Sequence, residues 1–467
     1  MARALGSYFA TVNEVTDYQT YTGLAAPMDF NGMVRHYYLR SGGYLGEVRL
    51  NLLPKDQREQ QSHEIALRIR PEIEKIAKQY GANLKIVEIP PGPPVLADLV
   101  AEVYGPPEAS INDLVTVSKR VRADMEKTEG VVDVDDFSET PHDKIRFDLN
   151  RDKAALSGVS VDQVAKTLRI ALAGQQVGTI HIDSERQPLA VQLQLPRALR
   201  SSEFDLMALR VRTDKGGLIP LSEVGTVTTL IEDQPIYHKN LQRVAYVVAG
   251  MAGRSPVEAV FDLNDTFAER PLPTGYKAEL AGEGEWKITV DVFRDLGLAF
   301  AAALVMIYVL LVGQTGSLTV PLVMMIAIPL TVIGIMPGFW ILNQLMASPI
   351  GAYPNPIYFT ATAMIGMIAL AGIVVRNSII LIDFIERIRA RADVTLTEAL
   401  IEAGAIRLRP IFLTAGAAMF GAFVIILDPI FSGLAWSFIF GIFASTLFSL
   451  LVIPVVYFLI NRDKTIA

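Results

Sequence analysis

The chain has 467 residues and a formal net charge of −7, with 51% apolar and 19% charged residues. A negative net charge without a basic patch interleaved with aromatic residues excludes a nucleic-acid-binding protein. Cysteine is absent, which excludes disulfides and thiolate chemistry but is compatible with more than one cellular compartment.

The average composition conceals two unlike parts. Residues 1 to about 290 carry most of the charge, whereas residues from about 293 to 460 contain apolar runs longer than the roughly 20 residues that cross a bilayer core. The sequence therefore predicts a membrane protein with a large water-exposed part.

One pattern occurs three times in the water-exposed part: a β-branched strand, an amphipathic helix and a second strand. The three passes cover residues 44–91, 99–137 and 243–284. Helix-period stretches that alternate with strand-period stretches predict split β-α-β units with their helices on one face of a sheet.

A region of different character separates the second and third passes. A helix is predicted over residues 160–173, and residues 175–240 then consist of strands and turns. Asp214-Lys215-Gly216-Gly217 supplies the turn between two of these strands. We predict an all-β insertion, which either docks another protein or simply elaborates the sheet.

Five membrane spans are predicted, over residues 293–313, 318–342, 357–385, 409–427 and 434–460. Neighbouring helices can satisfy the carbonyl groups that a proline frees, so the prolines of the second span predict kinks rather than breaks; they are Pro321, Pro329 and Pro337. Thr395 and Glu398 have the spacing of a capping box and predict a short cytoplasmic helix between the third and fourth spans.

Basic residues set the orientation of these spans, because an excess of them next to span ends marks the cytoplasmic side. They lie between the third and fourth spans and are Arg387, Arg389, Arg391, Arg407 and Arg409. Residues 1–290 are then expected outside the cytoplasm. The N-terminal residues have no signal-peptide core, so we expect a lost upstream span or a second chain to provide their export.

The scan for catalytic motifs gives little. Neither the phosphate-binding loop motif nor Gly-x-Ser-x-Gly occurs, so an ATP site is not encoded, no enzymatic activity is expected and no cofactor is expected. The five histidines lack zinc-ligand spacing; they are His36, His63, His142, His181 and His238. Four methionines of the water-exposed part could form a soft-metal site, although core packing is favoured; they are Met33, Met125, Met207 and Met251.

Arg376 is the most informative single residue. It ends a stretch from Leu296 to Val375 that contains no Asp, Glu, Lys or Arg. Its side chain either extends toward the cytoplasmic headgroups or pairs with carboxylates inside a helix bundle. Asp383 and Asp428 do not lie at the right depth, so the second interpretation predicts a partner outside this sequence.

Three motifs resemble the resistance-nodulation-division (RND) efflux permeases of the multidrug type. They are "GIVVRNSIILIDF" at 372–384, "IRLRPIFLT" at 406–414 and "GGLIPLSEVGTV" at 216–227. Their order and spacing match the C-terminal half of such a permease, from just after its first span to its end.

The resemblance implies an α+β membrane protein with the following parts: a first porter subdomain (1–105), a second porter subdomain (106–174 and 241–291), a docking-like β insertion (175–240) and five transmembrane helices (292–462). It implies that Arg376, Arg407 and Thr414 form a proton relay with an acidic pair from the missing N-terminal half, and that the cargo is a small hydrophobic or amphiphilic compound. This sequence departs from the family pattern in one respect: many drug pumps of the family have lysine at the position of Arg376.

The implied location is the bacterial inner membrane, with residues 1–290 in the periplasm and membrane lipid around the spans. The implied partners are the first half, further copies in a homotrimer, a periplasmic adaptor and an outer-membrane channel. The alternative from another class is a non-transporting receptor or assembly scaffold with an extracytoplasmic binding domain.

Overall fold

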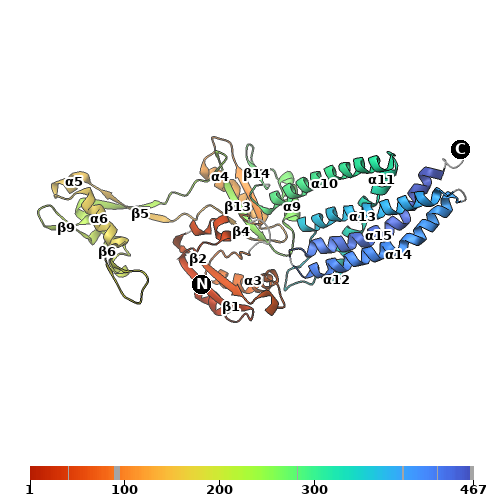
Figure 1. Cartoon of the computed structure of the whole chain (residues 1–467). Coiled ribbons are helices and arrows are strands. Elements are labelled where there is room, and N and C mark those ends of the chain that lie inside the picture. The colour runs from red at the N-terminus through yellow and green to blue at the C-terminus, as the bar shows by residue number, and fades with distance from the viewer. Residues whose placement is uncertain (40, 89–94, 281, 392–393, 429, 463–467) are drawn as a thin grey trace. The chain divides into compact units, whose positions relative to one another are not determined.

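The computed structural model describes the chain except residue 40, residues 89–94, residue 281, residues 392–393, residue 429 and residues 463–467. It divides into two compact units (Figure 1): Met1–Phe137 together with Tyr237–Ala467, and Ser138–Ile236. The first unit contains an N-terminal module, a four-stranded sheet and the apolar helices.

The N-terminal module is an antiparallel pair of strands covered by two helices. Strand β1 (Val15–Leu24) pairs with β2 (Ser41–Leu52), and α1 (Ala2–Phe9) and α3 (Ser62–Gln79) pack on them. Its apolar core comprises Leu5, Phe9, Val12, Ile65, Ile69 and Ile73. Shorter helices are α2 (Phe30–Val34), η1 (Tyr37–Leu39) and η2 (Lys55–Gln57).

The second strand predicted for the first β-α-β pass does not form over residues 82–88, and the rest of that prediction lies outside the described residues. Side chains of β4 (Val131–Asp136) take the place of a partner strand. The Ile86 amide donates to the Asp133 carboxylate at 3.1 Å, and Lys85 pairs with Asp135. Residues 82–88 are therefore held to β4 by side-chain contacts.

The second and third passes have the predicted element order and combine into one antiparallel sheet with the order β14-β3-β13-β4. The other strands are β3 (Leu99–Tyr104), β13 (Ala245–Met251) and β14 (Lys277–Glu279), and the helices are α4 (Ile111–Met125) and α9 (Pro256–Glu269). Alternate residues of β3 and β13 form a core with both helices. The expected boundary at residue 105 separates β3 from the strands with which it pairs, so β3 belongs to this sheet and not to the N-terminal module.

A short hairpin anchors the chain where it returns to the sheet. It consists of β11 (His238–Lys239) and β12 (Gln242–Arg243). The Lys239 ammonium lies 2.6 Å from the carboxylate of Glu102, which is 1% exposed. The Tyr104 hydroxyl donates to the same carboxylate at 2.7 Å, so the buried charge is both paired and hydrogen-bonded.

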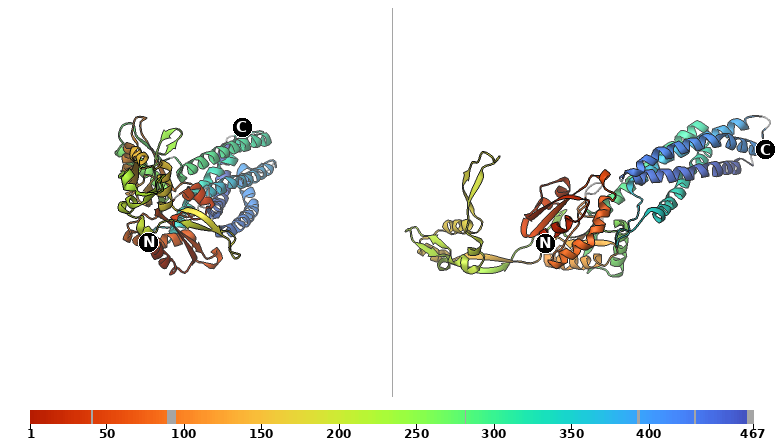
Figure 2. Two further views of the ribbon diagram at one scale, coloured as in Figure 1. Left: turned by 90° about the vertical axis from the view of Figure 1, so that its left-hand side faces the viewer. Right: turned by 90° about the horizontal axis from the view of Figure 1, so that it is seen from below.

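The second unit is a mixed structure. Its strands are β5 (Asp143–Leu149), β6 (Gln175–Ile180), β7 (Leu189–Leu193), β8 (Arg210–Arg212), β9 (Leu218–Pro220) and β10 (Gly225–Ile231), and its helices are α5 (Arg151–Leu156), α6 (Val161–Leu172), η3 (Arg197–Leu199), α7 (Glu203–Ala208) and α8 (Leu221–Val224). Figure 2 shows the β6–β7 hairpin, in yellow, projecting from the rest of this unit.

The predicted insertion over 175–240 is too short and is not all-β. Strand β5 pairs with β10 in continuous register from Leu149–Gly225 to Asp143–Ile231, which ties residues before the predicted insertion into the same unit. Helix α6, with Ser160 as its N-cap, confirms the helix predicted at 160–173. The predicted turn at 214–217 joins the paired strands β8 and β9.

In the described part of the chain, five helices are long and apolar enough to cross a membrane, as predicted. They are α10 (Glu285–Thr315), α11 (Val320–Met325) with α12 (Ala327–Met346), α13 (Ala361–Arg389), α14 (Leu396–Phe423, followed by η4, Val424–Leu427) and α15 (Ser432–Asn461). Ile326, between α11 and α12, keeps helical dihedral angles (φ −59°, ψ −25°). The second span therefore keeps helical dihedral angles through the interruption at Ile326.

The prediction of a separate short cytoplasmic helix before the fourth span is wrong. Thr395 and Glu398 form the predicted capping box, but the helix they begin continues to Phe423 and includes Pro410. Proline at this position removes one hydrogen bond without ending the helix.

Small residues set the packing of α12, α13 and α15. A Cβ at Gly334 would collide with the Cβ of Ala444, and a Cβ at Gly366 would collide with Ser437. Membrane helices use such small residues to bring their backbones close together. Helix α10 is different, because only 6% of its most apolar stretch is buried, against 50% for α13.

Candidate functional site: an exposed arginine on α13

Helix α13 has one tightly packed face and one exposed stripe. The packed face includes Val374, Ser378, Leu381 and Ile385, each at most 1% exposed. Arg376 lies on the exposed stripe, and it forms no ion pair or hydrogen bond with any residue that the structure describes. Among the described residues the cation is therefore unpaired.

The stripe has small residues on the N-terminal side of Arg376. Ala369 and Gly372 precede it by two turns and one turn, and nothing lies within 4 Å of the position that a Cβ would occupy at Gly372. The exposed side of α10 instead carries large side chains, including Val305, Met306 and Leu310. Small residues beside a cation leave space for another helix to approach closely.

The two carboxylates considered as counter-ions of Arg376, Asp383 and Asp428, are engaged elsewhere. Asp383 pairs with Arg387 at 2.8 Å, one turn further along α13. Asp428 accepts hydrogen bonds from the Ile430 and Phe431 amides at 2.8 and 3.1 Å. Neither residue supplies a counter-ion to Arg376 in this structure.

Arg407 has an incomplete set of partners. It is half-buried on α14, and its guanidinium lies over the ring of Phe384 of α13, 4.3 Å from the ring centroid. Its Nε is buried without a hydrogen-bond partner in the part of the chain that the structure describes. The contact with Phe384 is a cation–π interaction that fixes the guanidinium plane.

Thr414 is bound to its own helix. Its hydroxyl donates to the carbonyl oxygens of Pro410 and Ile411 at 3.1 and 3.0 Å, which is common for threonine inside a helix. Among the described residues, no hydrogen bond or ion pair joins Arg376, Arg407 and Thr414. The structure therefore places two of them on α14 and one on α13 without linking them.

Sequence reasoning missed a set of polar residues inside the bundle. Asn377 is 7% exposed and Ser378 is completely buried, with its hydroxyl donating to the Val374 carbonyl at 3.0 Å. Helix α15 adds buried hydroxyls at Ser437, Ser445, Thr446 and Ser449. The signal in the sequence was the recurrence of Ser and Thr in an otherwise apolar span, where polar residues carry a default expectation of function.

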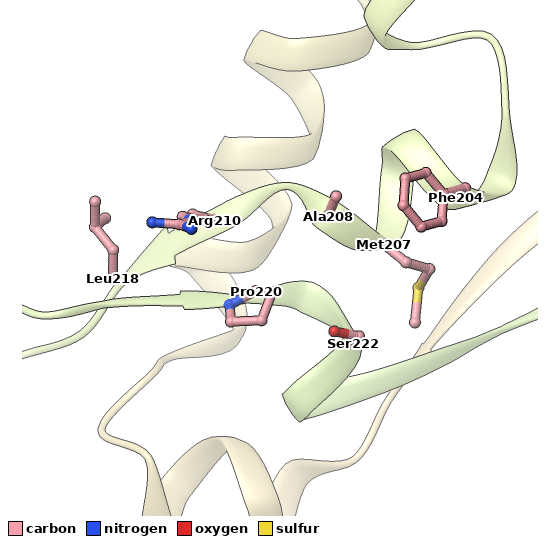
Figure 3. A pocket seen from close by; sticks show the side chains of 7 residues that line it. All are labelled: Phe204, Met207, Ala208, Arg210, Leu218, Pro220 and Ser222. Carbon is pink, nitrogen blue, oxygen red and sulfur yellow. The ribbon is translucent and has the colours of Figure 1, made fainter.

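The four methionines considered for a soft-metal site do not gather. Met125 and Met251 belong to the apolar core of the sheet, and Met33 is exposed on α2. Met207 lies in the second unit, beside a groove lined by Phe204, Ala208, Arg210, Leu218, Pro220 and Ser222 (Figure 3). Within the described ranges, no three His, Asp or Glu side chains cluster in a way that could hold a metal.

Asp98 is a carboxyl outside the membrane helices whose pKa is raised. Asp98 is half-buried just before β3, and its carboxylate accepts a hydrogen bond from the Met251 amide at 3.1 Å. Burial raises the pKa of this carboxyl above its ordinary value, against the lowering effect of the amide hydrogen bond and of Arg35.

Curated proteins are similar to this chain over most of its length. The swarming motility protein SwrC of Bacillus subtilis is 26% identical over 366 residues, 77% of this chain and 33% of that protein. The cobalt-zinc-cadmium resistance protein CzcA of Cupriavidus metallidurans is 27% identical over 79% of this chain and 34% of its own length. The multidrug resistance protein MdtC of Escherichia coli is 23% identical over 90% of this chain and 40% of its length.

These relatives are much longer than this chain, which spans about a third to two fifths of their length. Among solved structures, the crystal structure of a heavy metal efflux pump (crystal form II) has a TM-score of 0.75 at 19% identity. It covers 99% of this chain and 45% of the pump, and at this identity it shows a shared fold. The model of the AcrB/AcrD/AcrF family matches residues 11–461, so the chain belongs to this family of RND efflux permeases.

Proposed function

We propose that this chain is the C-terminal half of a proton-driven RND efflux permease that exports small hydrophobic or amphiphilic compounds from the inner membrane and the periplasm. The observation that carries the proposal is Arg376, which has no partner among the described residues and lies on the exposed stripe of α13 next to Gly372. An arginine facing lipid at the centre of a span costs at least about 2.5 kcal/mol. A helix that brings carboxylates to this stripe would remove the cost.

The partner helix would come from an N-terminal half that carries an acidic pair. The chain spans less than half the length of the relatives and solved structures compared with it, which supports a missing half of similar size. The nearly unburied α10 supports it as well, because a membrane helix of a compact bundle normally has more than one neighbour.

In the proposed mechanism Arg376 is a fixed counter-ion. A guanidinium keeps its proton at all relevant pH values, so the acidic pair would accept the transported proton and release Arg376 when neutralised. Moving one charge through a membrane potential of 100 mV supplies about 2.3 kcal/mol, enough to bias a conformational cycle. Arg407 and Thr414 would respond as further relay groups, and Thr414 must then leave the carbonyls of its own helix.

The water-exposed parts would then have separate tasks in the periplasm. The N-terminal module and the four-stranded sheet suit two porter subdomains that open and close around cargo, and the unit Ser138–Ile236 suits a docking subdomain. The complete pump would be a homotrimer that works with a periplasmic adaptor and an outer-membrane channel.

An apolar cargo is favoured by the segment between β1 and β2. It exposes large apolar and aromatic side chains, among them Leu24, Met28, Phe30, Met33, Tyr38 and Leu39. Exposed apolar patches of this kind mark sites of interaction. The names of CzcA and of the heavy metal pump raise metal ions as an alternative cargo, but the four methionines considered above do not form a soft-metal site.

The test is efflux by the complete pump, with this chain co-expressed with its first half. We expect Arg376→Ala to reduce proton-coupled efflux of an amphiphilic dye to the level of cells without the pump. The reason is that the acidic pair would lose the charge whose release signals protonation.

Arg387→Ala is the matched control, because Arg387 lies on the same helix and its side chain is 72% exposed beside Asp383. This variant should leave efflux unchanged. Wild-type efflux by the Arg376→Ala pump would refute the relay, provided that both halves are present in the membrane in normal amounts.

A further inference from the structure

Helix α15 carries two buried hydroxyl groups that lack hydrogen-bond partners. Thr446 is 4% exposed and Ser449 is 2% exposed. Neither the Thr446 Oγ1 nor the Ser449 Oγ has a partner among the described residues. A buried hydroxyl without a hydrogen bond destabilises a fold, because it loses its contacts with water and gains nothing in return.

Two other buried serines on the same helix are satisfied. The Ser437 hydroxyl donates to the Ala363 carbonyl of α13 at 2.8 Å, and the Ser445 hydroxyl donates to the Ile442 carbonyl at 3.1 Å. The helix therefore provides carbonyl partners for some of its hydroxyls, while Thr446 and Ser449 remain unsatisfied.

The two unsatisfied hydroxyls lie on one face of α15. Thr446 and Ser449 are separated by three residues, which brings their Cβ atoms to about 5–6 Å from each other in a helix. Ile442, Ile453 and Tyr457 belong to the same face and are at most 2% exposed. The Tyr457 hydroxyl donates to the Glu386 carboxylate of α13 at 3.4 Å, so this face meets α13.

The contacts between α13 and α15 also show which turn of α13 lies at the level of Thr446 and Ser449. Contacting residues differ by 74 positions at Ser437–Ala363 and by 71 at Tyr457–Glu386. The same offsets place Thr446 level with residues 372–375 and Ser449 level with residues 375–378 of α13. This is the turn that carries Arg376, although the hydroxyls lie inside the bundle and Arg376 lies on its exposed stripe.

We propose that Thr446 and Ser449 together bind internal water in the core of the five-helix bundle, at the level of Arg376. A buried water needs two to four polar partners, and two hydroxyls one helical turn apart provide them within the reach of a single molecule. The site gives the core of the bundle a hydrated point. It depends only on the folded chain and stands whether or not the proposed transport function is correct.

Radiolytic hydroxyl labelling with mass spectrometry tests this proposal on the full chain in lipid nanodiscs. Ile442 and Ile453 serve as reporters, because they share the face of the two hydroxyls and are 1% and 0% exposed. Radicals generated from a bound water should oxidise these buried side chains in the wild-type chain. The double variant Thr446→Val/Ser449→Ala, which preserves shape, should reduce their labelling severalfold.

Ser445→Ala is the matched control, since it removes a hydroxyl that already has a carbonyl partner; it should leave the labelling unchanged. Background labelling of Ile442 and Ile453 in the wild-type chain, or equal labelling in the double variant, would overturn the proposal. A density map of the wild-type protein gives a second measurement. It should contain a solvent peak at about 2.7–3.2 Å from both hydroxyl oxygens, whereas hydroxyls turned onto the helix carbonyls without such a peak would also overturn it.

Discussion

At the scale of single residues, Arg376 differs from the buried charges of the water-exposed part, which are paired. Arg70 and Asp133 are 5% and 7% exposed and pair at 2.6 Å between the N-terminal module and the sheet. Lys239 pairs with the buried Glu102. Arg376 has no counter-ion among the described residues, and this difference identifies it as a candidate for function rather than for stability.

Asp98 gives a prediction about stability and pH. Because its folded-state pKa is raised by burial, folding favours the protonated carboxyl. Its contribution to stability is therefore complete below the ordinary aspartate pKa of about 3.9 and is lost as the pH rises through the raised folded-state pKa. Asp98→Asn keeps an acceptor for the Met251 amide and carries no charge. We expect it to raise the midpoint of thermal unfolding at pH 7, with a gain that shrinks toward pH 4.

Thermal unfolding of the purified chain between pH 4 and 8 measures this difference. Asp56→Asn is the control, because Asp56 is exposed on η2 and its substitution should leave the midpoint nearly unchanged at every pH. A lower midpoint for Asp98→Asn at pH 7 would contradict the prediction.

At the scale of elements, glycines distinguish the faces that are already packed from the face that is not. Gly334 and Gly366 lie where α12 and α13 meet α15, and neither position has space for a Cβ. Gly372 lies on the exposed stripe of α13 and has open space beside it. The two kinds of glycine should therefore respond differently to the same substitution.

Gly334→Leu should destabilise the isolated chain by about 1–3 kcal/mol or more, because the added side chain overpacks the contact with Ala444. Gly372→Leu should leave the isolated chain as stable as the wild type. In the complete pump, however, Gly372→Leu should prevent association, since the proposed partner helix must approach this stripe closely.

The measurements are the unfolding midpoint of each purified variant and its co-purification with the first half. Normal association of the Gly372→Leu chain would show that no helix packs against this stripe. Early unfolding of the Gly372→Leu chain by itself would show that the stripe is already packed within the chain.

At the scale of the whole molecule, the chain is a multi-pass inner-membrane protein of the RND family with two compact units. The unit Ser138–Ile236 interrupts the other, and the residues on either side of the interruption lie together. The rings of Phe137 and Tyr237 have centroids 5.5 Å apart.

This closeness predicts that the interrupting unit is removable. Deleting residues 138–236 and joining Phe137 to Tyr237 through about four Gly or Ser residues, which span up to about 13 Å, should leave the first unit folded and inserted in the membrane. Gel filtration in detergent and thermal unfolding should give a monodisperse protein with a midpoint within a few degrees of the parent.

Deletion over the boundaries predicted from the sequence, 175–240, is the control. It removes β10, the partner of β5, and it removes Lys239, which leaves the Glu102 charge buried without its partner. Leaving a buried charge unpaired costs about 3–5 kcal/mol, so this shorter deletion should aggregate. If both deletion variants fold equally well, the boundaries of the unit Ser138–Ile236 do not determine the stability of the rest of the chain.

The sequence by itself determined the features that depend on local periodicity and composition. The five apolar spans, the helix at 160–173, the capping box at Thr395 and Glu398 and the element order of the second and third β-α-β passes were all predictable from residue spacing. The charge-free stretch before Arg376 singled out that residue without any tertiary information.

Only the tertiary structure decided which distant segments pair and which side chains they bury. It assigned β3 to the sheet with β13, joined β5 to β10 and replaced a predicted strand at 82–88 with side-chain contacts to β4. It also buried the hydroxyls of Thr446 and Ser449 without a hydrogen-bond partner among the described residues. Strand pairing and burial depend on residues far away in the chain, and residue spacing within one segment carries no information about those partners.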